Sequence, residues 1–162
     1  MRKLFLLAAG LAMTLTACQK DEVSPSAGAT SQTITVSIPQ GVQTRAAAAD
    51  FGDGSQIDRC LLQIYRNGQP YGEQQTATVT GNTATFNLRL VAQQKYDFVF
   101  WADCSEAGYE TDDLSAITLG SDADYTGNDD KFDAFFLCKK DYTVTESFSE
   151  TFTLRRPFGQ LN

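Results

Sequence analysis

The side chains that could perform chemistry in this chain are carboxylates and thiols, because the 162-residue sequence contains no histidine. Histidine is the commonest general base and metal ligand, so Ser-His-Asp triads, Cys-His pairs and histidine-rich metal sites are excluded. Two carboxylate pairs remain, Asp103 with Glu106 and Asp112 with Asp113. A glycosidase needs two carboxyl groups at a defined separation, which closeness in sequence does not establish. The sequence therefore favours a protein without a catalytic role.

An acidic segment in the second half of the chain has a spacing typical of a calcium-binding loop. Its six matching positions are Asp122, Asp124, Thr126, Gly127, Asp130 and Asp133. The match is incomplete, because Asp133 replaces the longer bidentate glutamate and Asp129 occupies a position that is usually apolar. No helical pattern flanks the segment. A solvated acidic loop is therefore favoured over calcium, and no metal or other cofactor is predicted.

A second kind of covalent chemistry is indicated near the N-terminus. A positively charged start precedes an apolar stretch, residues 4–12, that is too short to span a bilayer, as in a secretory signal peptide. Residues 15–18 (Leu-Thr-Ala-Cys) then resemble the bacterial lipobox, in which the cysteine thiol receives a diacylglycerol and becomes the mature N-terminus. Each buried methylene contributes roughly 0.8 kcal/mol, so two or three acyl chains such as palmitate give stable anchoring. Residues 1–17 are predicted to be the signal peptide and Cys18 the lipidated residue, with ordinary secretion as the alternative.

The residues after Cys18 indicate where the protein is located in the cell. They resemble the lysine-plus-acidic signal that sends some lipoproteins to the outer face of the bacterial outer membrane, and they are Gln19, Lys20, Asp21 and Glu22. A plain solvated tether is the alternative. Residues 18–32 are predicted to be the lipidated N-terminus and a linker, since Val23 onwards is rich in Ser, Ala, Thr, Gly and Pro. The expected location is the outer membrane, lipid-anchored and exposed at the surface.

The charge of the chain argues against nucleic acid as a partner. The formal net charge is −7, and removal of residues 1–17 takes away Arg2 and Lys3, which leaves −9. Phosphate binding needs clustered lysine and arginine, and no basic stripe is visible. Contact with the membrane is therefore expected through the lipid.

Residues 33–162 are predicted to form one all-β domain. Residues 33–38 alternate polar and apolar side chains, which is the period of a strand with one buried face. Further strands are predicted at residues 57–66, 76–79, 83–91, 96–102, 116–119, 132–140 and 142–154. Seven or eight short strands separated by turn residues predict two antiparallel sheets packed as a β-sandwich with Greek-key connections.

Four short motifs in this domain have a familiar form. They are residues 42–46 (Val-Gln-Thr-Arg-Ala), 96–103 (Tyr-Asp-Phe-Val-Phe-Trp-Ala-Asp), 131–135 (Lys-Phe-Asp-Ala-Phe) and 154–162 (Leu-Arg-Arg-Pro-Phe-Gly-Gln-Leu-Asn). Together they resemble the N-terminal domain of fimbrillin-like surface lipoproteins, the Mfa-like and Fim-like subunits of type V pili. The resemblance implies a transthyretin-like sandwich. In that family a second sandwich usually follows, which leaves open whether one follows Asn162.

The resemblance also implies a role for Arg45 and Ala46. In pilus-forming members an arginine-specific protease cuts after the first strand, that strand leaves, and a donor strand of another subunit replaces it. Arg45 lies where the cut would fall, in a small-residue segment of the kind that proteases nick. The expected function is a pilus or adhesion subunit, with other subunits or host and bacterial surface ligands as partners. An ordinary loop arginine is the alternative, and an anchor subunit should resist a cut that removes its lipid.

Aromatic side chains leave a second function open. Trp101 lies opposite the core face of its predicted strand, and Tyr109 and Tyr125 lie in polar segments nearby. Such a group is compatible with stacking against sugar rings, so a glycan- or other ligand-binding surface lipoprotein is the alternative function. Cover for the sheet is the other interpretation of the same side chains.

Three cysteines follow Cys18, and all of them lie on apolar positions of their predicted strands, as buried thiols do. They are Cys60, Cys104 and Cys138. Packed sheets lie about 10 Å apart, which is farther than a disulfide reaches, so a bridge would have to join neighbouring strands or close a sheet corner. Cys104 with Cys138 is the preferred pair, and three free thiols are the alternative.

The calcium alternative has a direct test. If residues 122–133 form a solvated acidic loop, millimolar calcium should leave the melting temperature of the chain unchanged, because no site exists to favour the folded state. A thermal melt with and without calcium measures this, with magnesium as the matched control. A rise specific to calcium would contradict the prediction.

Overall fold

The structure is a computed structural model that describes residues 28–39, 54–121, 123–125 and 130–157. Several predicted features lie outside these ranges: the signal peptide, Cys18, residues 19–22, and Arg45 with Ala46. In the described ranges, helical structure is limited to two short 3-10 turns, η1 (Ser105–Ala107) and η2 (Asp130–Phe132). None of the helices there is long and apolar enough to cross a membrane.

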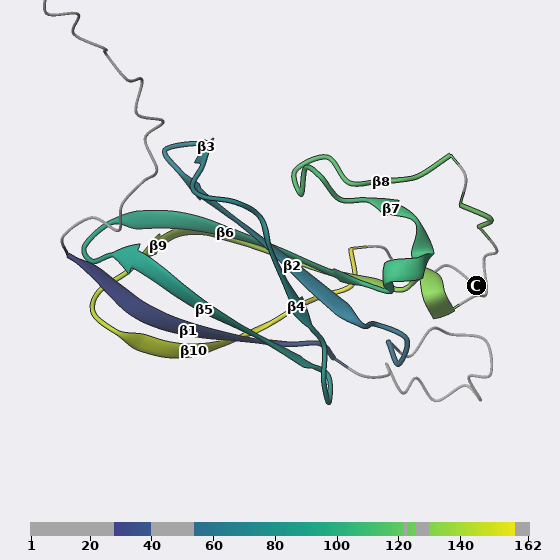
Figure 1. The fold of residues 1–162 in the computed structure, drawn as a ribbon, viewed down its shortest axis with the longest axis horizontal. Coiled ribbons are helices and arrows are strands. Elements are labelled where there is room, and N and C mark those ends of the chain that lie inside the picture. Colours follow the sequence, from purple (N-terminus) through teal and green to yellow (C-terminus); the bar gives the residue numbers. More distant parts are fainter. Residues whose placement is uncertain (1–27, 40–53, 122, 126–129, 158–162) are drawn as a thin grey trace, which may run out of the picture.

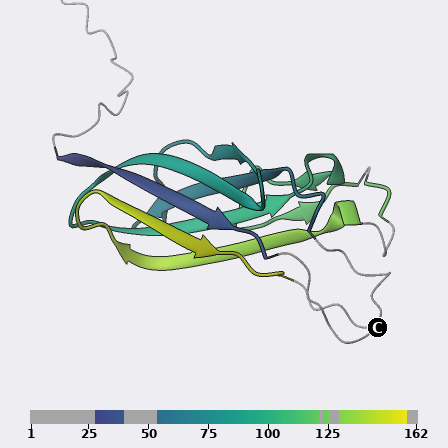
Figure 2. The ribbon, with the colours of Figure 1, turned by 90° about the horizontal axis from the view of Figure 1, so that it is seen from below.

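Two sheets pack face to face (Figures 1 and 2). The smaller sheet has the order β10-β1-β5, with bounds Phe148–Thr153, Ala29–Ser37 and Thr83–Val91. The larger sheet has the order β3-β2-β6-β9, with bounds Gln69–Pro70, Arg59–Arg66, Lys95–Asp103 and Ala134–Thr143, and β4 (Gln75–Thr78) also pairs with β2. A small hairpin joins β7 (Tyr109–Glu110) and β8 (Thr118–Leu119). The predicted all-β sandwich is confirmed.

One pairing departs from the predicted antiparallel arrangement. β1 and β10 run parallel, with Ile34 level with Glu150 and Val36 level with Phe152. On its other side β1 pairs antiparallel with β5. Parallel neighbours are joined by long connections, and here they come from opposite ends of the described chain, so local alternation could not reveal this pairing. β1 is thus the middle strand of the smaller sheet.

Some strand boundaries also differ from the predictions. β1 begins at Ala29, so residues 29–32 belong to the sheet and not to a linker. The predicted break at Asp141 is absent, because β9 continues through this residue at a positive φ of 54°. The Asp141 N–H donates to Asp97 Oδ1 (2.7 Å) where the pairing of β6 and β9 shifts register. A local β-bulge therefore accommodates Asp141 within β9, although aspartate is common in turns.

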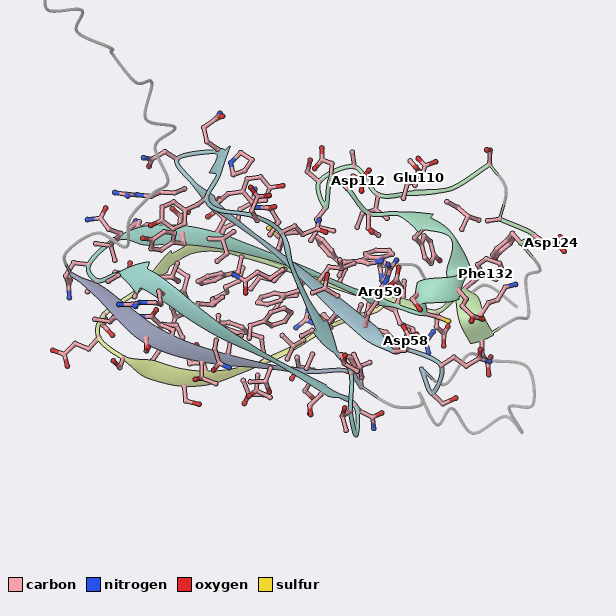
Figure 3. The ribbon with its side chains drawn as sticks, in the orientation of Figure 1. Asp58, Arg59, Glu110, Asp112, Asp124 and Phe132 are labelled. Atoms are coloured by element: carbon pink, nitrogen blue, oxygen red, sulfur yellow. The ribbon has the colours of Figure 1, made fainter. Side chains whose placement is uncertain are left out.

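The main core lies between the two sheets, and its side chains fill the space between them (Figure 3). Inward-facing residues of β1, β2, β5 and β6 supply most of it, since alternate residues of a strand face the same side. A second apolar cluster covers the other face of the larger sheet and is built around Trp101, Val99 and Leu61. Leu114 and Ile117, from the β7–β8 connection, pack on it. Both faces of the larger sheet are therefore covered.

The packing of β1 gives a prediction on stability. Ile34 is fully buried, so Ile34→Ala should lower the free energy of unfolding by about 2–5 kcal/mol through lost burial and a residual cavity. Thr35→Ala, on the opposite face of the same strand, is the matched control and should cost no more than about 1 kcal/mol. Urea unfolding of both variants measures the difference. Equal losses would show that β1 does not pack as described.

Candidate functional site

The candidate functional site is the position of β1 between β10 and β5, called the β1 slot below. Four side chains point from β1 and its end into the core, with exposed fractions of 2% or less. They are Gln32, Ile34, Val36 and Ile38. The opposite face of β1 carries Ala29 and four hydroxyl side chains, those of Ser31, Thr33, Thr35 and Ser37. Recognition of β1 by the rest of the domain therefore depends on backbone pairing and on these four inward side chains.

The walls of the β1 slot are attached to the other sheet by contacts that do not involve β1. Phe152 of β10 packs against Phe98 and Phe100 of β6, with ring centroids 6.4 and 5.8 Å apart. Phe86 of β5 packs against Phe100 at 6.0 Å. None of these aromatic contacts involves β1, because both partners of each contact lie on other strands.

The wall formed by β10 has a further attachment. Just after β10, Arg155 exchanges two backbone hydrogen bonds with Phe136 of β9, at 2.7 and 3.0 Å. This bridge joins the edge of the smaller sheet to the edge of the larger one. The bond from the Leu154 N–H to the Ser37 carbonyl (2.9 Å) depends on β1, as does the ladder between β10 and β1.

One end of the β1 slot is polar. The Gln32 side chain accepts a hydrogen bond from the Leu90 N–H at Oε1 (3.1 Å) and donates from Nε2 to the Thr30 hydroxyl. The Thr30 hydroxyl donates to the Leu90 carbonyl (3.4 Å). Gln32 was assigned to the linker by sequence, although it lies two residues before Ile34 and so continues the inward-facing alternation. That spacing was the available signal for this residue.

The other end of the β1 slot leads to the segment that contains Arg45. The Ile38 N–H donates to the Asn82 carbonyl (2.9 Å), and the Gly54 N–H donates to Asp133 Oδ2 (2.9 Å). A Cβ added to Gly54 would lie 3.7 Å from the Pro39 carbonyl oxygen. Pro39 and Gly54 are therefore close. The residues that precede and follow segment 40–53 thus lie next to each other.

An ion pair lies beside the place where Pro39 and Gly54 approach each other. Arg156 Nη1 lies 2.6 Å from Asp133 Oδ1, and the guanidinium lies over the ring of Phe135, 4.9 Å from its centroid. Charge-assisted, nearly bidentate pairs of this kind are the stronger ones. Because Gly54 also donates to Asp133, the residue that follows segment 40–53 is held by contacts independent of β1.

Asp133 was also the last position of the calcium-like spacing, and its carboxylate is occupied by Arg156 and Gly54. Asp122, Thr126 and Gly127 of that spacing lie outside the described residues. Among the residues that are described, no group of three or more Cys, Asp or Glu side chains is placed to hold a metal ion.

Two members of the predicted carboxylate pairs have clear surroundings: Asp103 is engaged in other contacts, and Asp113 is exposed. Asp103 is fully buried and accepts from Arg59 Nε (2.6 Å) and from Trp101 Nε1 (3.0 Å). The hydrogen bond to Asp103 is the main cause that raises the pKa of Arg59 above its ordinary value. Figure 3 places Arg59 beside Asp58, away from Asp112 on the β7–β8 side. Asp113 is exposed, and hydrogen bonds from Ser115 lower its pKa.

The aromatic residues considered for sugar binding do not form an open platform. Trp101 is only 3% exposed and packs edge-on against Tyr109, with ring centroids 5.3 Å apart. Tyr109 donates its hydroxyl to the Phe132 carbonyl (2.7 Å), and burial raises its pKa to about 12. Tyr125 is 60% exposed but packs against Phe132 at 4.9 Å. Cover for the sheet is therefore the role of Trp101 and Tyr109.

The predicted bridge between Cys104 and Cys138 is wrong, since both thiols are free. Cys138 lies opposite Val99 in the pairing of β6 and β9, whereas Cys104 follows the end of β6. Five residues of extended chain separate these levels, about 16 Å, and a disulfide requires Cα atoms within about 7 Å. Cys60 is buried in the main core.

The described residues define a β-sandwich domain whose smaller sheet is completed by a central strand from the N-terminal side of the domain. The chain belongs to a family of unknown function, DUF6562, whose sequence profile matches residues 24–162. Among solved structures it is similar to a candidate polysaccharide-binding protein (DUF1812) of Bacteroides thetaiotaomicron, at 15% identity and a TM-score of 0.43. The similarity covers 78% of this chain and 47% of that one, so the chain spans about half the length of its neighbour. None of the curated proteins matches the sequence significantly.

The free thiols give a prediction on reactivity. Burial raises the pKa of Cys60 to about 12, so this thiol should stay protonated and unreactive in the folded chain as pH rises from about 7 to about 10. Cys138 is half-buried and serves as the internal comparison, since it should be labelled first by a thiol reagent. Peptide mapping after labelling measures the order, and denaturation without reductant should expose all three thiols. A peptide linked through Cys104 and Cys138 would contradict this result.

Proposed function

We propose that this protein is a lipid-anchored surface lipoprotein that serves as a pilus or adhesion subunit, in which a strand of another subunit takes the place of β1. The observation that carries the proposal is that β1 is the middle strand of the smaller sheet, while both neighbouring strands are held by contacts that do not include it. The fimbrillin-like sequence motifs support the same assignment. No catalytic role is part of the proposal.

A cut at Arg45 would leave β1 attached only by non-covalent contacts, because Arg45 lies between β1 and the rest of the domain. Those contacts are substantial, since each buried Ile or Val side chain contributes about 1.5–3 kcal/mol. The cut strand would therefore stay in place in the absence of a competitor. An incoming strand with similar inward side chains restores the same burial and backbone pairing, so exchange requires little net free energy.

The β1 slot can accept a strand in either direction. β10 runs parallel to β1 and β5 runs antiparallel to it, so β10 and β5 run in opposite directions. Any strand placed between them forms one parallel and one antiparallel ladder, whichever way it points. Strand addition of this kind provides affinity through main-chain hydrogen bonds and specificity through alternate side chains.

The proposed location of the domain changes with cleavage at Arg45. Before cleavage, Cys18 would hold the domain at the outer membrane through its lipid, and residues 19–22 would direct it to the cell surface. After cleavage, the lipid would remain with β1 and the rest of the domain would be held by its neighbours in the assembly. The partners are therefore the membrane at first and other subunits later.

The test compares cells that produce the natural chain with cells that produce Arg45→Ala. The natural chain should run as a ladder on unheated detergent gels, should collapse to one band on boiling, and should begin at Ala46 by N-terminal sequencing. Arg45→Ala should give a single band that keeps its lipid, since the cut is prevented.

Arg89→Ala is the matched control, because Arg89 is an exposed arginine on β5 that lies outside the proposed cleavage site. It should leave the ladder unchanged. A chain that is cut at Arg45 and nevertheless stays monomeric on the cell surface would contradict the proposed assembly.

A further inference from the structure

We infer that strand exchange in the β1 slot begins at the end of β1 that is farther from Arg45, where the incoming strand first pairs with residues 89–91 of β5. Residues 29–31 of β1 are called the entry end below, and residues 36–38 the locked end. The inference rests on the proposed function and adds the place where the partner strand enters. Cleavage at Arg45 is then not what opens the slot, because Arg45 follows the locked end in the sequence.

The two ends of β1 differ in their backbone pairing. β5 pairs with β1 along its whole length, whereas β10 pairs with it only from Gln32 to Ser37. Within the described residues, the entry end therefore belongs to one ladder, while Val36 and Ser37 of the locked end belong to two. Opening of the entry end breaks backbone pairing with β5 alone.

Side-chain burial is also concentrated toward the locked end. Ile34, Val36 and Ile38 lie in the main core and are at most 2% exposed. Burial of such side chains is the dominant favourable contribution to folding. The entry end has small side chains, none of them fully buried, and they are Ala29, Thr30 and Ser31. Opening of the entry end therefore exposes little apolar surface.

Hydrogen bonds outside the strand pairs strengthen the same difference. At the locked end, the Ile38 N–H donates to the Asn82 carbonyl and the Leu154 N–H donates to the Ser37 carbonyl, both at 2.9 Å. At the entry end, the Thr30 hydroxyl donates to the Leu90 carbonyl at 3.4 Å. Water replaces a hydrogen bond at a small net cost, but it does not replace apolar burial. The entry end is thus the end of β1 that opens more readily.

Opening of the entry end uncovers main-chain groups of β5 at residues 89–91 while the rest of the slot is still filled. An uncovered strand edge is a template for pairing with another strand. A partner strand that pairs there can advance toward the locked end and displace β1 step by step. Each apolar position is then covered by the old strand or by the new one, whereas prior departure of β1 would expose Ile34, Val36 and Ile38 together.

The cut at Arg45 acts at the last step of this sequence. In the uncut chain, a displaced β1 stays joined to the domain through segment 40–53, so it competes for the slot at a high effective concentration. After the cut, the displaced strand is no longer held beside the slot by that segment. Cleavage therefore makes the exchange lasting, and the entry end makes it fast.

The experiment uses the full chain cut at Arg45 and fluorescent synthetic peptides with the sequence of residues 29–39. One peptide is unmodified, one carries a methyl group on the backbone nitrogen of Thr30, and one carries it on that of Val36. The Ile38 N–H points toward the β5 side, and alternate residues of a strand share this orientation, so both methyl groups remove an N–H that faces β5. Fluorescence anisotropy measures the rates of uptake and release, and native mass spectrometry follows loss of the original N-terminal fragment.

The methyl group at Thr30 should slow uptake about 2- to 10-fold, because it removes a main-chain hydrogen bond that forms in the first step. The methyl group at Val36 is the matched change. It should leave the rate of uptake unchanged and speed release by a similar factor, because its bond forms after the rate-determining step. The rate of uptake should rise with peptide concentration, since the incoming strand takes part in the displacement of β1.

Hydrogen exchange in the uncut chain gives a readout that does not depend on strand exchange. After correction for intrinsic rates, the Thr30 amide should exchange faster than the Val36 amide, because the entry end opens locally while the locked end stays paired. Equal protection of the two amides would overturn the inference, whatever the peptides do.

The outcomes for the peptides separate this inference from the proposed function. If the methyl group at Val36 slows uptake as much as the one at Thr30, or more, entry at residues 29–31 is wrong and strand exchange stands. Uptake at a rate independent of peptide concentration would have the same meaning, since β1 would then leave before its replacement arrives. If no peptide enters the cut chain, the proposed strand exchange and this inference are both overturned.

Discussion

The contact on which the rest of this structure depends is the stack of aromatic rings between the two sheets. Phe98 and Phe100 of β6 contact Phe152 of β10, and Phe100 also contacts Phe86 of β5. One strand of the larger sheet thereby positions both outer strands of the smaller one. This arrangement fixes the width of the β1 slot. Because the rings of β1's neighbours pack directly on β6, the slot is a property of the scaffold and not only of the strand that fills it.

Two partly buried ion pairs hold the segments that the sheets themselves do not organise. Arg59 with Asp103 lies where β2 and β6 pair beside the β7–β8 connection, and Arg156 with Asp133 lies where segment 40–53 rejoins the domain. Removal of Arg59 would leave the buried charge of Asp103 uncompensated. The scaffold is therefore apolar between the sheets and ionic at the end where the irregular segments meet. The polar contact at Leu90 lies away from both pairs, at the opposite end of β1.

Period-two alternation was sufficient to locate most strands, because the main core takes alternate residues from each of them. It failed where a polar side chain is buried, and where a residue type common in turns lies within a strand. Gln32 has a satisfied amide and so continues β1 where the pattern looked like linker, and Asp141 is absorbed by a bulge within β9. The parallel pairing of β1 with β10 and the pairing of Asp133 with Arg156 depend on residues far apart in sequence. No local pattern contains that information.

The parallel pairing of β1 with β10 also orders events during folding. Gln32 pairs with Phe148, so β1 cannot complete its sheet until β10 has been synthesised. Contacts of such high sequence separation form late and slow the folding of β proteins. In the interval, β1 can pair with β5 along one edge, and its other edge has no partner within its own chain. A chain held at a membrane by its N-terminus would pass this interval with β1 nearest the lipid. Because β1 is synthesised before the other strands and β10 after them, β1 waits longest for its second neighbour.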